Sequence, residues 1–194
     1  MNPIIVRMNE VGISTDTQPI IGTQALGPCV GVLIHSKNQK KSVVLHASSD
    51  WKQLIVETLI VLAEAKLISI ENFNKGIENL YLHDQFNLYD FDSKTKQAIL
   101  TKKGLNITKV EETLEVTIIP GYYQDNYEVA INLAKYFMSL SPLVKVKSDQ
   151  LPKKAVRTVM FDDLGSHEFF YDSQNSKFVT EKVKDIVDSK GYRL

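Results

Sequence analysis

Hydrophobic positions along the chain gather in short apolar runs separated by polar turns and by longer amphipathic stretches. Two apolar, β-branched runs at 29–34 and 42–46 flank the polar segment 36–41. Runs of this length, bounded by polar residues, are typical of buried strands. The polar segment therefore predicts a hairpin that lays the second strand beside the first.

Most of the remaining chain divides into elements in the same way. Strands are predicted at 4–6, 77–82, 114–119, 156–161, 168–171 and 177–180, and helices at 50–66, 93–103 and 127–140. Asp50 with Gln53 resembles a capping box, Gly104 suits the end of the second helix, and Asn126 precedes the third. Strands and about three helices without strict alternation predict an α+β fold, a layered sandwich of mixed β-sheets with flanking helices.

Length and composition narrow the class of protein without naming a function. The chain has 194 residues, 43% of them hydrophobic, which fits one globular domain over 1–194. Lys+Arg and Asp+Glu both number 23, so net charge gives no pull toward nucleic acid or an anionic membrane. Lysine outnumbers arginine 20 to 3, which leaves few residues for bidentate phosphate binding. We expect no nucleic-acid partner.

The beginning of the chain and its most apolar stretch bear on location. Residues 1–7 lack the charged region and long apolar region of a signal peptide. The stretch 54–65 contains two glutamates and is far shorter than the roughly 20 apolar residues of a membrane span. We expect a soluble protein, either cytoplasmic or delivered to a host cytosol without a cleavable N-terminal signal.

The single cysteine stands in a distinctive constellation. Thr23 lies six residues before Cys29, and His46 lies seventeen residues after it. Taken alone, the cysteine is typical of a small core residue and the histidine of a strand residue bonded to a carbonyl. Together they indicate a thiol–imidazole pair, because the predicted hairpin brings His46 back near Cys29. A thiol needs a nearby base to act as a nucleophile, and the base needs an orienting group such as Thr23.

These residues resemble the motif of the CheD family of chemoreceptor glutamine deamidases and of related bacterial deamidating toxins. The motif consists of Thr23, Leu26-Gly27, Cys29-Val30 and His46. The resemblance spans roughly 20–50 and does not place 120–194. It implies a protein-glutamine deamidase with Cys29 as nucleophile, His46 as base and Thr23 as its orienting group. It also implies a thioester intermediate, a protein substrate carrying the target glutamine, and no metal or organic cofactor.

Two departures from the family pattern bear on mechanism and substrate. Pro28 replaces the family's serine and has no N–H, so one backbone donor for an oxyanion is missing. The Cys29 N–H and a neighbour across the site remain as donors, and Gly27 and Val30 are further candidate oxyanion or substrate contacts. The family's Leu-Pro pair after the histidine is also absent, since 47–50 reads Ala-Ser-Ser-Asp. A toxin or effector acting on another protein fits at least as well as a chemoreceptor enzyme.

Other interpretations of the same residues stay open. The Cys29–His46 pair also suits a cysteine protease or a transglutaminase, and a spoiled oxyanion site would leave a catalytically dead CheD-like binding module. His35 lies on the same strand face as Cys29 and is a rival base. It is expected at the surface, about 20 Å away along an extended strand. Tyr122 and Tyr123 follow a Pro-Gly turn, either as substrate contacts or as the start of a helix with one ring packed.

Overall fold

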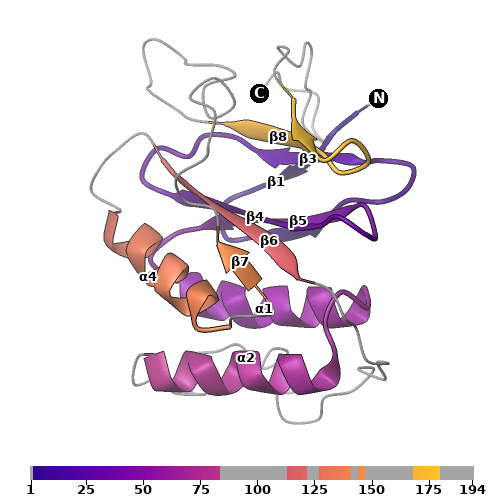
Figure 1. The fold of residues 1–194 in the computed structure, drawn as a ribbon. Coiled ribbons are helices and arrows are strands. Elements are labelled where there is room, and N and C mark those ends of the chain that lie inside the picture. The colour runs from indigo at the N-terminus through magenta and orange to yellow at the C-terminus, as the bar shows by residue number, and fades with distance from the viewer. Residues whose placement is uncertain (1, 84–112, 122–126, 141–143, 147–167, 180–194) are drawn as a thin grey trace.

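A computed structural model describes residues 2–83, 113–121, 127–140, 144–146 and 168–179. In this part of the chain, two mostly antiparallel sheets lie face to face, and three helices stand below the second sheet (Figure 1). The predicted α+β class with layered mixed sheets is confirmed at this level.

Each of the two sheets combines strands from distant parts of the sequence. One sheet has the order β1-β3-β8-β9, made of β1 (Ile4–Val6), β3 (Ile20–Thr23), β8 (Phe169–Asp172) and β9 (Lys177–Phe178). The other has the order β2-β5-β4-β6-β7, made of β2 (Val11–Ile13), β5 (Lys41–Ala47), β4 (Val30–Ser36), β6 (Leu114–Pro120) and β7 (Val144–Val146). Only β1–β3 and β6–β7 are parallel among the described pairs.

The hairpin predicted from the two apolar runs is the centre of the five-stranded sheet. β4 and β5 pair antiparallel, with Val30 opposite Ala47 and Ser36 opposite Lys41. Both strands are buried almost throughout, since they are covered on both faces. That burial explains why they read as continuous apolar runs and not as alternating ones.

The helices cover one face of the five-stranded sheet. α1 (Trp51–Glu64) and α4 (Tyr127–Met138) lie against this sheet, and α2 (Ile70–His83) packs beyond them (Figure 1). Two of the three predicted helices are thus confirmed in position. The capping box at the start of α1 is not, because the Asp50 side chain makes no capping hydrogen bond.

The predicted strand at 77–82 is wrong, because these residues belong to helix α2. Ser69 caps this helix, since its hydroxyl accepts a hydrogen bond from the Asn72 N–H at 3.1 Å. Gly76 is buried inside it, where a Cβ would lie 2.7 Å from a Leu59 side-chain atom of α1. The helix therefore contains a residue of poor helix propensity that allows close helix packing.

The remaining predictions of strands and helices have mixed outcomes. Strands β8 and β9 fall at the predicted positions, each within two residues at its ends, while β2, β3 and β7 were not predicted. The predicted helix 93–103, the strand 156–161, Gly104 and Asn126 lie outside the described residues.

Side-chain alternation along β4 and β5 divides the core into two. The helix-side core, between the five-stranded sheet and the helices, includes Val30, Val32 and Leu45. The inter-sheet core, between the two sheets, consists of Val6, Ile21, Leu26, Cys29, Leu33, Val44, Ile119, Phe169 and Tyr171. The single cysteine thus lies between the sheets. No helix in the described ranges is long and apolar enough to cross a membrane.

Candidate active site

The chain changes sheets between Thr23 and Cys29. Thr23 is the last residue of β3 in the four-stranded sheet, and Cys29 directly precedes β4 in the five-stranded one. Ala25 makes the bend with a left-handed φ of 56°, which is uncommon for a residue other than glycine. This crossing places Thr23 on one wall of the inter-sheet space and Cys29 on the other, so the predicted constellation meets between the two sheets.

Thr23 and His46 form a direct, buried hydrogen bond. The Thr23 Oγ1 lies 2.7 Å from His46 Nδ1 and 2.6 Å from the backbone oxygen of Val6. A carbonyl oxygen can only accept, so the single hydroxyl proton of Thr23 goes to Val6. Thr23 must then accept from His46, and Nδ1 carries the imidazole proton. The neutral ring therefore has its lone pair on Nε2, as a general base requires.

The other ring nitrogen of His46 has no partner. The residue is 3% exposed, and Nε2 is the buried side-chain N or O atom in the described part of the chain that lacks a hydrogen bond. Leaving such an atom unsatisfied costs about 1–3 kcal/mol. Buried polar groups are nearly always paired, so a fixed and unpaired lone pair is a feature that needs a functional explanation.

Cys29 lies diagonally across the hairpin from His46. Gly31 is directly opposite His46, and Cys29 stands two residues before Gly31, which gives it the same side of the sheet. Diagonal neighbours of this kind are about 7–8 Å apart. The thiol is buried, at 3% exposure for the residue, and His46 Nε2 makes no hydrogen bond to it. The structure thus brings together all three predicted residues, with only the Thr23–His46 contact made.

Gly31 shapes the space between the thiol and the imidazole. A Cβ at this position would lie 2.6 Å from a ring carbon of Phe169 and 3.0 Å from a side-chain carbon of Leu26. The Phe169 ring of the opposite sheet therefore covers Gly31 closely. This ring excludes water from the inter-sheet side of the hairpin, where low polarity strengthens electrostatic interactions.

Burial sets the protonation of both groups. It raises the pKa of the Cys29 thiol, and it lowers the pKa of His46 to about 4, although the Val6 carbonyl and the Glu10 carboxylate oppose that decrease. Near neutral pH the resting pair is therefore a neutral thiol and a neutral imidazole. A thiolate–imidazolium ion pair is therefore not the resting state of this geometry.

The candidate oxyanion contacts lie on either side of the thiol. Gly27 is buried in the turn before Cys29, and Pro28 between them is exposed. Val30 already belongs to the ladder, opposite Ala47 on one side and Pro120 on the other. Gly27 is thus the candidate that precedes the β4 ladder. Tyr122 and Tyr123 lie outside the described residues.

The expected surface position of His35 is wrong. His35 is 2% exposed at the far end of β4, and both its ring nitrogens have hydroxyl partners. Its Nδ1 lies 2.9 Å from Ser42 Oγ and its Nε2 lies 2.9 Å from Ser176 Oγ in the β8–β9 turn. Ser173 donates to the Ser42 hydroxyl at 2.8 Å. We call these four residues the hydroxyl cluster; it joins the two sheets by hydrogen bonds.

The hydroxyl cluster was missed from the sequence because its members are far apart along the chain. The hairpin register places His35 opposite Ser42, and this pair was within reach of sequence reasoning. The contact with Ser176 spans 141 residues and depends on β8 pairing with β3. No local pattern carries that information.

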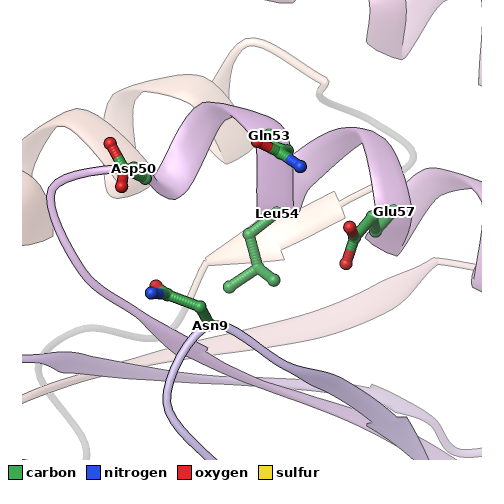
Figure 2. Close-up of a pocket in the computed structure, with 5 residues that line it drawn as sticks. All are labelled: Asn9, Asp50, Gln53, Leu54 and Glu57. Carbon is green, nitrogen blue, oxygen red and sulfur yellow. The ribbon is translucent and has the colours of Figure 1, made fainter. Parts of the chain in front are cut away.

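A polar pocket lies on the other side of the five-stranded sheet. It has a volume of about 120 Å³ and is lined by Asn9, Asp50, Gln53, Leu54 and Glu57, as Figure 2 shows. Leu54 belongs to the helix-side core, whereas His46 follows the strand face of Val44 in the inter-sheet core. The pocket is therefore separate from the thiol, although Asn9 donates its N–H to the His46 carbonyl at 2.8 Å.

Comparison with protein families and curated proteins identifies no relative of this chain. No protein-family model matches the chain, and no curated protein sequence matches it. Among the described residues, no group of three or more His, Cys, Asp and Glu side chains is placed to hold a metal ion. Function has to be inferred from the geometry around Thr23, Cys29 and His46.

Proposed function

We propose that this protein is a cysteine-dependent deamidase that converts a glutamine side chain of a partner protein to glutamate. The observation that carries the proposal is the orientation of His46. Thr23 fixes its proton on Nδ1 and leaves a buried, unpaired Nε2 on the same side of the hairpin as the only thiol. The resemblance of these residues to the CheD motif supports the same reaction. Within that reaction class, we propose the role of a toxin or effector that acts on another protein.

The chemistry follows general-base catalysis and not a preformed ion pair. As the thiol of Cys29 attacks the carboxamide carbon, its proton moves to His46 Nε2 and the carbonyl electron pair moves to oxygen. The tetrahedral intermediate collapses when the C–N bond breaks, and the imidazolium gives its proton to the departing ammonia. Water then attacks the thioester with His46 as base, which releases glutamate and restores the thiol.

Burial of the site favours a side-chain carboxamide as substrate. Cys29 is buried, but its neighbour Pro28 and the bend residue Ala25 are exposed, so the thiol lies just below the surface. A slender, unbranched glutamine side chain needs a narrower opening than a polypeptide backbone with its flanking side chains. A narrow opening therefore favours deamidation of a side chain over proteolysis by the same Cys–His pair.

The test is a comparison of products formed by the wild type and by Cys29→Ala. Each protein is incubated with a proteome extract, and peptides are searched by mass spectrometry. We expect glutamine residues that gain about one dalton with the wild type alone. Equal conversion by both proteins overturns the assignment of Cys29. Cleaved peptides point to a protease, and amine attachment to a transglutaminase.

A catalytically dead binding module is the second candidate, and the raised pKa of Cys29 favours it. The two candidates differ in how p-nitrophenyl acetate acylates Cys29 as pH changes. A deamidase with His46 as base gives a rate that is nearly constant from about pH 5 to the pKa of the thiol. A module without an active base gives a rate that rises about tenfold per pH unit over the same range, because only free thiolate reacts.

A further inference from the structure

Gly121 has a special place next to the turn that carries the thiol. It directly follows β6, whose last residue, Pro120, is paired with Val30 of β4. A Cβ on Gly121 would overlap the backbone oxygens of Leu26, Gly27 and Cys29. The backbone oxygens of three residues of one turn, 26, 27 and 29, thus all lie where a Gly121 side chain would begin. Backbone atoms of a turn cannot yield as the end of a side chain can, so only glycine fits.

The direction of these carbonyls determines the direction of the N–H groups. In a trans peptide the C=O of one residue and the N–H of the next point in opposite directions. With the Leu26 oxygen at Gly121, the Gly27 N–H points away from Gly121.

We propose that Gly121 is a positioning residue that holds the carbonyls of the Cys29 turn on its own side and leaves the Gly27 N–H on the opposite side as an oxyanion donor. The inference rests on the proposed function, since it concerns acyl transfer at Cys29. It explains how the site works with a proline before the cysteine. The peptide before Pro28 has the same orientation but carries no hydrogen, and Val30 is already in the ladder.

The test separates acyl transfer from simple reactivity of the thiol. Acylation by p-nitrophenyl acetate forms an oxyanion, whereas alkylation by iodoacetamide does not. In Gly121→Ala we expect acylation of Cys29 to fall roughly 10²–10³-fold, as on loss of an oxyanion donor. Alkylation stays within about threefold of wild type. The matched control is Gly76→Ala in α2, a buried glycine whose Cβ meets Leu59 and Tyr136 instead; both rates stay near wild type.

A second variant adds a donor without crowding the turn. Pro28→Ala gives residue 28 an N–H that points away from Gly121, as the Gly27 N–H does, at an exposed position that tolerates the change. We expect acylation to rise about two- to tenfold, with alkylation unchanged.

The possible results distinguish a failure of the role of Gly121 from a failure of the proposed deamidase function. Acylation and alkylation that fall equally in Gly121→Ala, or acylation that does not rise in Pro28→Ala, overturn the role of Gly121. A wild type whose acylation shows no dependence on His46 overturns the proposed function itself.

Discussion

Two buried histidines lie between the same two sheets but differ in the hydrogen bonding of their ring nitrogens. His35, at one end of β4, has hydroxyl partners on both ring nitrogens. His46, on β5 beside the other end of β4, has a partner on Nδ1 and none on Nε2. Both are nearly inaccessible, at 2% and 3% exposure. Burial therefore does not separate them, but hydrogen bonding does.

The difference teaches where stability and chemistry are located in the inter-sheet space. A histidine satisfied on both sides contributes hydrogen bonds that hold strands together, and its lone pair is occupied. A histidine oriented on one side and open on the other keeps a lone pair for a reaction, at a cost in folding free energy. His35 joins β4, β5 and the β8–β9 turn, whereas His46 leaves its Nε2 unpaired on the side of the hairpin that carries the thiol.

The largest expected effect is on catalysis. His46→Gln lowers acylation of Cys29 by p-nitrophenyl acetate at about pH 6 roughly 10²–10⁴-fold, which is about 3–5 kcal/mol of activation free energy. His35→Gln, the matched control on the other histidine, changes the rate less than about threefold. A larger loss in the His35 variant than in the His46 variant would reverse the assignment of the two residues.

The next effect is on the pH dependence of stability. Burial lowers the pKa of His46 to about 4 from 6.5, so the unfolded chain binds a proton in this range that the folded protein does not. Stability from this residue is complete above about pH 6.5 and is lost as pH falls toward 4. Urea titrations should show roughly 2–3 kcal/mol more loss between pH 7 and 4.5 in wild type than in His46→Leu. Parallel losses in both proteins contradict this interpretation.

A smaller effect is expected from apolar substitution at neutral pH. His35→Leu removes a partner from Ser42 and Ser176 and the edge contact of the ring with Tyr171 at 4.9 Å between centroids. It should lower the free energy of unfolding by about 2 kcal/mol. His46→Leu leaves the Thr23 hydroxyl bonded to Val6 and should change stability by less than about 1 kcal/mol. Equal losses in denaturant titrations would show that both histidines are structural.

The smallest effect concerns the orientation of the imidazole. Thr23→Val removes the acceptor of the Nδ1 proton at almost constant volume, so acylation should fall about tenfold. Thr23→Ser keeps the hydroxyl and serves as the control, with a rate within about threefold of wild type. Nitrogen NMR of the His46 ring should report a proton on Nδ1 in wild type and in the serine variant. A proton on Nε2 in wild type would contradict the derived tautomer.

The part of the site that lies on the β4–β5 hairpin was predictable from the sequence. The apolar runs set the two strands, the polar turn set their pairing, and the period of two placed Cys29 and His46 on one face. Thr23 was identified by spacing and resemblance only. The strand that carries it was not predicted, because β3 is four residues long and pairs with the distant β8.

Long-range contacts explain what sequence reasoning missed. The helix α2 was mistaken for a strand over 77–82 because Gly76 and three asparagines weaken the helical pattern, although Ile70, Phe73 and Ile77 keep its spacing. The burial that shifts the pKa values of Cys29 and His46 comes from the second sheet. The neutral resting pair was therefore invisible in the motif itself.

The position of β3 between β1 and β8 has a consequence for the order of folding. Residues 4–47 contain the hairpin, β1 and β3, and they leave the ribosome long before residues 169–172. Non-local strand pairing is slow, so β8 completes the four-stranded sheet last. Until then the inter-sheet core has no Phe169 above Gly31. We therefore expect the nascent chain to hold its one thiol open to solvent, and the dry environment around Cys29 and His46 to arise only when β8 pairs with β3.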